Sequence, residues 1–565
     1  MRTAGFESVL FVLLVLTTDI MGQQSGWQWA RSVSSDGGNY AMRSAADGAG
    51  NVYVSGYFGN DTIYFGSDTL FHSDNYGGDV FLVKYDGAGN VIWARNFPSG
   101  RNFPNSDDDH DLVCDANGNV YFTVILGLDT AVYGAFTLVN ANADTVSWTN
   151  LDVITVKCDS SGNVVWAKCM GGTRSDFSQG LCVDDNNNVY LTGHFLSDTL
   201  LFAGDTLYCQ SNLGHEVFMV KYDSLGNETW ARQGIGNLED IGRSIDTDAN
   251  GNIYVTGFFN SDGIQFGSIM LNNLNIGIFQ FFMVKYDSNG NALWARKANS
   301  ADDNRGYDVA VDNAGNILAT GAFKGASITF GSVFISNTAA TGYYDVLVVK
   351  YDPSGNVIWA KGDGSTDGDL GYSICVTANN AVLVTGRYGL SYAVFGNDTC
   401  MNAGTLGTGD AFIVKYDVNG NELWLRSANG NGDDQGNSIC VNTAGDVFIT
   451  GFYWINLTVG SFTLTNPGNG GSEMFLAKLG ATTGIAEQDE TNELLVYPNP
   501  VTDVVQVQAT DAFTLLLYNA AGTLILELNS TTGNINVDMS GYLPGVYFLM
   551  LKSKEQQQVR KIVKS

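Results

Sequence analysis

The chain has 565 residues, with 28 Lys and Arg against 58 Asp and Glu, so its net charge is −30. This acidity argues against binding nucleic acid or an anionic membrane surface through charge. Its 68 glycines and 7 prolines suit many tight turns between strands rather than disorder.

Residues 1–22 are predicted to form a secretory signal peptide. Arg2 supplies the charged start, and the unbroken apolar run Val9–Leu16 precedes the small residue Gly22. This run is too short to span a bilayer, which needs about 20 residues, so we expect an exported chain without a transmembrane segment. Export permits disulfides, but four of the eight cysteines lie in strand-like runs just before turns, and we expect mostly free, buried thiols.

The central part of the chain repeats one phrase at a spacing of about 65 residues. In the copy Val284–Arg296, an alternating apolar run ends in Tyr286-Asp287, and a second run with Trp294 follows an Asn/Gly turn. Alternation on both sides of a short turn predicts a β-hairpin. The tryptophans of the repeat, which we expect to pack between repeats, are Trp29, Trp93, Trp166, Trp230, Trp294, Trp359 and Trp424.

Each repeat contains four strand-like runs. In the unit 240–296 these runs are Arg243–Asp248, Ile253–Phe259, Phe281–Asp287 and Ala292–Lys297. An insert around Phe266-Gly267 separates the second run from the third. Repeated four-stranded units predict an all-β fold, a β-propeller. The last of seven units lacks its tryptophan strand, and Gly26–Arg31 can supply it, so we predict a seven-bladed propeller over residues 25–480 that its N-terminal strand closes.

Two phrases of the repeat carry a family resemblance. Asp248–Gly257 reads D-A-N-G-N-I-Y-V-T-G, and Phe282–Trp294 reads F-M-V-K-Y-D-S-N-G-N-A-L-W. Both phrases resemble the SBBP type of seven-bladed β-propeller repeat, which implies the fold but no single activity. The second unit departs most from this pattern, with Val124 in place of the glycine and a longer insert through Trp148.

The turns of the repeat carry Asp first, Gly fourth and Asn fifth in most copies. Aspartate-rich turns can bind Ca²⁺, but that ion takes six to eight oxygen ligands. The simpler interpretation is that Asp accepts backbone N–H groups across the turn while Gly adopts the left-handed conformation. We favour this structural role and expect no metal or other cofactor.

A second aligned position lies eight residues before the first turn of each unit. It holds one Asp or Asn per blade: Asn39, Asp107, Asp176, Asp240, Asn304, Asp369 and Asp434. We expect these residues to gather at one mouth of the central channel, where they either tether the loop or bind a cation or a hydroxyl-rich ligand. Uniformity favours the tether, because binding sites usually break the symmetry of a repeat.

The second unit is then the place to expect a special site. It departs most from the repeat around Asp107–Asp111 and Asn140–Asp152, and it contains His110 between two aspartates. The chain has no nucleophile-elbow, zinc-protease or phosphate-loop motif. Our hypothesis is a non-enzymatic module that binds a glycan or a protein. The alternative is a polysaccharide hydrolase or lyase that uses the acidic mouth.

The composition changes after the propeller. Residues 481–492 form a polar linker, and seven short alternating runs within 493–565 predict a small β-sandwich. Three motifs occur there in order: Tyr497-Pro498-Asn499-Pro500, Gly545-Val546-Tyr547 and Lys561-Ile562-Val563-Lys564. They resemble the type A C-terminal sorting domain of type IX secretion. The resemblance implies that the secretion machinery is a partner and that the protein is released from, or held on, the surface of a Gram-negative bacterium.

Overall fold

The computed structural model of the protein describes residues 26–480 apart from 36–37, 60–61, 74–77, 102–109, 142–149, 203, 211–213, 338–341, 390–391, 397, 403, 405–407 and 467–470. It also describes residues 495–564 apart from 498–500, 510–512, 520–523, 531–532 and 553–556. The predicted signal peptide and the linker 481–492 lie outside the described residues. The chain forms two compact units, Met1–Thr482 and Thr483–Ser565. Every regular element described is a β-strand, which confirms the all-β prediction.

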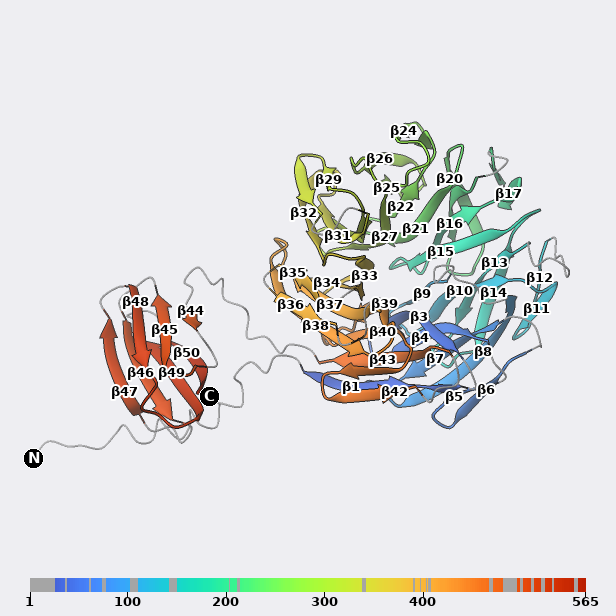
Figure 1. The fold of residues 1–565 in the computed structure, drawn as a ribbon. Coiled ribbons are helices and arrows are strands. Elements are labelled where there is room, and N and C mark those ends of the chain that lie inside the picture. The colour runs from blue at the N-terminus through green and yellow to red at the C-terminus, as the bar shows by residue number, and fades with distance from the viewer. Residues whose placement is uncertain are drawn as a thin grey trace, which may run out of the picture. The chain divides into compact units, whose positions relative to one another are not determined.

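The first unit is a ring of seven four-stranded antiparallel sheets, and Figure 1 views it nearly along its axis. The innermost strands are β3 (Asn39–Ala46), β9 (Leu112–Cys114), β15 (Asp176–Val183), β21 (Asp240–Thr247), β27 (Asn304–Val311), β33 (Leu370–Val376) and β39 (Gln435–Val441). The second strands are β4 (Val52–Phe58), β10 (Val120–Leu126), β16 (Val189–Phe195), β22 (Ile253–Phe259), β28 (Ile317–Phe323), β34 (Val382–Tyr388) and β40 (Val447–Tyr453). The third strands are β7 (Gly78–Tyr85), β13 (Asp152–Cys158), β19 (Glu216–Tyr222), β25 (Gln280–Tyr286), β31 (Asp345–Tyr351), β37 (Asp410–Tyr416) and β43 (Glu473–Leu479). The outermost strands are β8 (Val91–Arg101), β14 (Val164–Met170), β20 (Glu228–Ile235), β26 (Ala292–Lys297), β32 (Val357–Asp363), β38 (Glu422–Gly430) and β1 (Trp27–Ser32).

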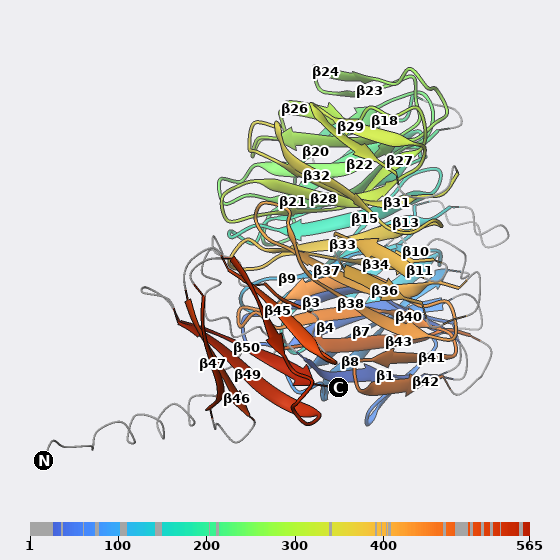
Figure 2. The same cartoon turned by 60° about the vertical axis from the view of Figure 1, so that its left-hand side comes forward.

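The insert between the second and third strands of each blade is a short hairpin. The seven hairpins are β5 (Thr62–Phe65) with β6 (Asp68–Phe71), β11 (Thr130–Tyr133) with β12 (Phe136–Val139), β17 (Thr199–Phe202) with β18 (Asp205–Tyr208), β23 (Gly263–Phe266) with β24 (Ile269–Asn272), β29 (Ser327–Phe330) with β30 (Val333–Ser336), β35 (Tyr392–Phe395) with β36 (Asp398–Met401), and β41 (Asn456–Val459) with β42 (Phe462–Thr465). They lie on the outside of the ring, as β23–β24 and β41–β42 show in Figure 2. A hairpin strand pairs with the outermost strand of the preceding blade, as β23 does with β20 and β5 does with β2 (Ser34–Ser35), which follows β1.

The N-terminal strand closes the ring, as the sequence predicts. Strand β1 pairs antiparallel with β43, with Trp29 opposite Lys478 and Arg31 opposite Leu476. The seventh sheet therefore joins the start of the propeller to its end, and its order is β1-β43-β40-β39. Closure of this kind leaves no free edge between the first blade and the last.

The hydrophobic cores lie between neighbouring sheets. One core, for example, packs Val217 and Met219 of β19 against Val255 of β22 and Phe282 of β25. Six of the seven repeat tryptophans are buried, as predicted, and Trp424 is partly buried. None of the eight cysteines, all of which lie within the described residues, forms a disulfide, and each is buried or partly buried. The expectation of thiols packed in the interior is therefore confirmed.

A glycine in the second strand lets the innermost strand bulge. A Cβ at Gly257 would lie 2.0 Å from the carbonyl oxygen of Ile241. Opposite it, the register of β21 against β22 shifts between Gly242 and Ser244, which leaves Arg243 outside the ladder. The second blade has Val124 instead, and in its described part β9 pairs with β10 only from Leu112 onward.

Each Asp turn is held by its own side chain, as the structural interpretation predicts. In the turn after β25, Oδ1 of Asp287 accepts the N–H groups of Asn289 (2.9 Å) and Asn291 (2.8 Å), and its Oδ2 accepts the Asn291 amide (2.8 Å). These bonds, first those from Asn291, hold the pKa of Asp287 below its ordinary value. Gly290 has a φ of 78°. Both carboxylate oxygens are thus engaged by N–H donors.

In six of the seven blades the tryptophan of the outermost strand lies against the turn glycine of the next blade; these tryptophans are Trp29, Trp93, Trp166, Trp230, Trp294 and Trp359. The indole Nε1 of Trp359 donates to the carbonyl of Val418 at 3.1 Å, and its ring lies so close to Gly420 that a Cβ there would approach Cδ2 to 2.8 Å. In the blade before, Nε of Arg296 donates to the carbonyl of Gly355 at 2.9 Å. We call this contact of a tryptophan and its neighbouring basic residue with the next turn the blade latch. It explains why Trp, Arg, Gly and Asp recur together.

The C-terminal compact unit, which follows the propeller in the chain, contains the seven predicted strands in two sheets. One sheet has the order β44 (Leu495–Tyr497), β45 (Val504–Ala509) and β48 (Gly533–Asp538), and the other β47 (Leu524–Ser530), β46 (Phe513–Asn519), β49 (Gly545–Lys552) and β50 (Gln557–Lys564). Val505 and Val537 of the first sheet share one core with Leu515 and Leu549 of the second. Gly545 pairs with Lys564, so the second and third sorting motifs lie on adjacent strands, while Pro498, Asn499 and Pro500 lie outside the described residues.

Ring closure can be tested by deletion. Removing Gly26–Arg31 takes β1 away from β43, exposes the backbone of that strand and removes the buried Trp29. The loss of one buried tryptophan alone costs about 3–5 kcal/mol, and an open edge promotes association. We expect a lower melting temperature in calorimetry and higher-order species in size-exclusion chromatography, compared with a chain that begins at Gly26. A monomer with an unchanged melting temperature would contradict the closure and the blade count.

Candidate functional site

The aligned Asp and Asn residues are buried at the start of the innermost strands. Asn39, Asp176, Asp240, Asn304, Asp369 and Asp434 expose none of their surface, and Asp107 lies outside the described residues. In the third blade, Asp176 accepts the Ser197 N–H (3.2 Å) and hydroxyl (2.7 Å). Asp240 holds Ser261 in the same way in the fourth blade. Since no surface of the six side chains is open to the channel, we assign them the tether role rather than the ligand-binding role.

Each tether also faces the third strand of the preceding blade. Asp240 lies beside Glu216, Asp369 beside Asp345, and Asp434 beside Asp410. In two blades the tether is an amide instead of a carboxyl group. Asn39 donates to the carboxylate of Glu473, and Nδ2 of Asn304 donates to Oε1 of Gln280 at 3.2 Å. We call these contacts the seam pairs. An amide can donate where an ionised carboxylate cannot, so the carboxyl pairs make the equivalent bond only when one partner is protonated.

Burial favours that protonated form. Desolvation, together with a smaller contribution from the neighbouring carboxyl groups, raises the pKa of Asp240 and Asp369 to about 7 and that of Asp434 to about 8. A carboxyl group whose folded pKa exceeds its unfolded value, about 3.9 for Asp, binds more protons folded than unfolded between the two values. The free energy of unfolding therefore falls as the pH rises from about 4 to about 8.

The seam pairs thus predict a specific pH dependence. Asp434→Asn, which copies the amide found at Asn39 and Asn304, should weaken the dependence of the unfolding free energy on pH between about 5 and 8. The exposed Asp398→Asn should leave it unchanged. Urea unfolding at several pH values measures both. An equal loss of stability at the acidic and the basic end of this range in Asp434→Asn would show that the pair carries no proton.

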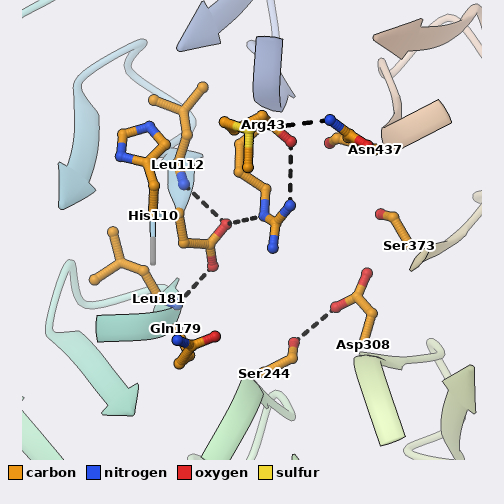
Figure 3. A network of polar contacts seen from close by, with 12 residues as sticks. Arg43, His110, Leu112, Gln179, Leu181, Ser244, Asp308, Ser373 and Asn437 are labelled. Carbon is orange, nitrogen blue, oxygen red and sulfur yellow. Dashed lines mark hydrogen bonds and ion pairs between the residues drawn. The ribbon is translucent and has the colours of Figure 1, made fainter. Parts of the chain in front are cut away.

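A polar network links the innermost strands along the channel. Asp111 accepts the N–H of Leu181 on the next blade at 2.6 Å, Asp308 accepts that of Ile374 at 2.8 Å, and Ser438 accepts that of Ser44 at 3.0 Å. Figure 3 shows labelled members of this network from different blades turned toward one central space: Arg43, Gln179, Ser244, Asp308, Ser373 and Asn437. The network therefore joins blade to blade at the axis.

One ion pair joins the first and second blades in the described part of the channel wall. Nε of Arg43 lies 3.3 Å from Oδ1 of Asp111. Burial raises the pKa of Asp111 to about 6, although Arg43 opposes the shift. Since the Asp111 carboxylate already takes the Leu112 and Leu181 N–H groups, it serves the wall of the channel rather than a reaction.

His110 is fully buried instead of lying in a solvated acidic loop. Its Nδ1 contacts the carbonyl of Thr123 and its Nε2 contacts the hydroxyl of Ser55. Burial lowers the pKa of His110 to about 3, so the ring is neutral. Both ring nitrogens are occupied, and the residues described contain no group of three or more His, Cys, Asp or Glu that could hold a metal ion. His110 is therefore a packing residue of the second blade.

Aromatic and arginine side chains, most of them partly exposed, gather instead on the fourth to sixth blades, where the innermost strands begin. The guanidinium of Arg305 lies 4.5 Å from the ring centre of Phe279 and 5.1 Å from that of Phe258. Tyr307 lies 6.4 Å from Phe258 and 5.9 Å from Tyr372, measured between ring centres. We call these five residues the mouth cluster.

The mouth cluster is held in place by charged neighbours. Nε and Nη2 of Arg305 donate to the two oxygens of Asp303 at 3.0 and 2.9 Å, and the Tyr344 hydroxyl donates to the same carboxylate at 2.9 Å. Arg243 lies 5.4 Å from the ring of Tyr307 and donates to Gln179 at 2.9 Å. These contacts fix the orientation of the aromatic rings, as a binding surface requires.

The sequence prediction placed the special site in the second unit and missed this cluster. Asp107–Asp109 and most of the insert 140–152 lie outside the described residues, and His110 is buried. A signal was nevertheless present in the alignment. The residue three places after each aligned Asp or Asn changes from blade to blade, and it reads Met42, His110, Gln179, Arg243, Tyr307, Tyr372 and Asn437. Such variation at one repeat position marks a surface that does not serve the repeat itself.

Comparison with known proteins supports the two-part organisation. Residues 495–565 match the secretion system C-terminal sorting domain, and residues 229–261 match the β-propeller repeat of the SBBP type. The protein is therefore a seven-bladed propeller of such repeats, followed in the chain by a sorting domain. This tail marks the protein for export by type IX secretion to the cell surface or the extracellular space.

Two curated proteins are similar in sequence. An uncharacterised WD repeat-containing protein, L264 of Acanthamoeba polyphaga mimivirus, is 25% identical over 505 residues, which is 75% of this chain and 36% of that protein. The regulatory protein FlaEY of Caulobacter vibrioides is 26% identical over 121 residues, 21% of this chain and 13% of its own length. The chain thus spans about a third or less of these relatives.

Among solved structures, a mutant of puromycin hydrolase complexed with PGG is similar in fold. It has a TM-score of 0.39 and 9% identity, and the match covers 83% of this chain and 58% of that one.

None of the residues described here forms a helix of the length and hydrophobicity that a membrane crossing requires.

Proposed function

We propose that this exported propeller is a non-enzymatic module that binds a glycan at the mouth cluster. The observation that carries the proposal is the pair Tyr307 and Tyr372, two partly exposed rings 5.9 Å apart. Aromatic faces bury the apolar faces of ligands at low entropic cost, and a fixed arginine-carboxylate pair such as Arg305–Asp303 offers both donors and acceptors beside them. Sugars present both apolar faces and groups that donate and accept hydrogen bonds.

The channel carboxylates favour binding over hydrolysis or elimination. Asp111 and Asp308 each accept backbone N–H groups, and Asp246 accepts that of Val311 at 2.8 Å. Burial raises the pKa of Asp246 to about 7, but the group is committed to joining two blades. We propose that the protein needs no metal, because the turn carboxylates face N–H donors. Its delivery depends on the sorting domain, whose partner is the secretion machinery.

The proposal predicts retardation of the protein in native gels that contain xylan, laminarin, pectin or mucin. At least one of these should slow the wild-type protein, with or without EDTA. The double variant Tyr307→Ala, Tyr372→Ala should bind at least tenfold more weakly, a loss of about 1.4 kcal/mol, because it removes the aromatic platform. Phe334→Ala is the matched control, since Phe334 is 67% exposed on the outer hairpin β29–β30 and makes no part of the mouth cluster.

Two results would contradict the proposal. Retardation that survives in the double variant would place the binding surface elsewhere, and a lack of retardation in all four gels would remove the glycan ligand. Release of shortened saccharides by the wild-type protein, abolished in the double variant, would instead establish the hydrolase or lyase alternative.

A further inference from the structure

A pocket of about 440 Å³ opens between the fourth and fifth blades. Its walls come from three segments: 273–275 with Gln280, which follow the hairpin β23–β24, the connection 297–302 between the blades, and 325–327 at the start of β29. The volume lies in the range of small-molecule sites, about 300–1,000 Å³. It is separate in composition from the mouth cluster, because none of the five mouth residues lines it.

Half of the residues that line this pocket are neutral and polar. Six of its side chains carry an amide or a hydroxyl group: Asn273, Asn275, Gln280, Asn299, Ser300 and Ser327. The charged residues in the lining are Lys297 and Asp302, one of each sign. Gln280 is committed to its bond with Asn304, but the other amides and hydroxyls can donate and accept hydrogen bonds, so the pocket suits a neutral ligand that does the same.

The walls are tied together before any ligand arrives. Asn299 and Thr329 exchange two backbone bonds of 2.9 Å across the two blades. Nδ2 of Asn275 donates to the carbonyl of Ser300 at 3.1 Å, and Nζ of Lys297 donates to Oδ1 of Asn299 at 3.0 Å. Burial lowers the pKa of Lys297. A pre-organised polar wall lowers the cost of ordering side chains on binding.

The apolar side chains of the lining lie at its edge, and with the carbon atoms of the polar residues they make apolar surface the larger share of the wall. Leu274 is 93% exposed, and Ala301 and Ala326 are also exposed. An edge of this kind can cover the C–H face of a ring whose hydroxyls reach the amides inside. A lipid or an apolar peptide would instead cover the ammonium group of Lys297 and the carboxylate of Asp302 without offering them hydrogen bonds, which is unfavourable for each polar group that is buried in this way.

We propose that this pocket is a binding site for one neutral sugar residue, independent of the mouth cluster. The hydroxyl groups of the sugar exchange hydrogen bonds with the amide side chains of the pocket and with Lys297 and Asp302. The site should therefore accept a free monosaccharide, whereas the mouth cluster, an open aromatic surface, should need a longer chain.

Saturation-transfer-difference NMR tests the proposal with glucose, galactose, mannose, xylose and N-acetylglucosamine as probes, each with the full-length exported protein. At least one probe should give a transfer signal with the wild type. Ala326→Trp, which fills the pocket from an exposed position, and Lys297→Ala, which removes a donor, should each reduce it at least tenfold. Phe334→Ala and Tyr307→Ala should keep it, and all four variants should keep the wild-type melting temperature within a few degrees.

Any one of the following three outcomes would overturn the proposal. If no probe gives a signal, the pocket does not take a neutral sugar. If the signal survives Ala326→Trp, the sugar binds elsewhere. If Tyr307→Ala removes the signal and Ala326→Trp does not, the sugar binds the mouth cluster, so the proposed function would stand while this inference fails.

Discussion

The fold depends on one repeated contact, the blade latch, in which a tryptophan of one blade lies against a turn glycine of the next. Three features contribute to this contact. The turn must be held by its Asp, as Asp287 shows. The turn residue must have no side chain, because a Cβ at Gly420 would come within 2.8 Å of Trp359. The indole can also donate to a carbonyl, as Trp359 does to that of Val418.

This constraint decides where function can lie. The residues that recur in every blade are committed to latches, tethers and seam pairs, and their carboxylates are buried or enclosed by N–H donors. Only positions that the repeat leaves free can serve a ligand. Tyr307 and Tyr372 occupy such a position, and the segment 273–275 lines the pocket between the fourth and fifth blades. The acidic composition of the chain is therefore mainly a property of the scaffold, and the candidate sites carry aromatic, amide and basic groups.

The propeller was predictable from sequence because its strands, turns and latches are local patterns repeated seven times. The missing tryptophan strand after Leu479 was enough to place Gly26–Arg31 in the last blade. The hairpins were not predicted, since strands of four residues such as β23 and β24 are too short for a clear alternation. The burial of Asp240 was not predictable either, because it depends on Glu216 and Ser261 from different blades and strands. The mouth cluster needs the bulge and the ring to bring three blades together.

A matched pair of substitutions tests the latch most directly. Gly420 and Gly277 have φ values of 82° and 83°, so an alanine meets the same backbone strain at both. A Cβ at Gly420 meets Trp359, whereas one at Gly277 meets nothing within 4 Å. Overpacking of this kind costs about 1–3 kcal/mol, so equilibrium unfolding should show Gly420→Ala less stable than Gly277→Ala by that amount. Equal stability of the two variants would contradict the account, because the tryptophan contact would then contribute nothing to holding the blades together.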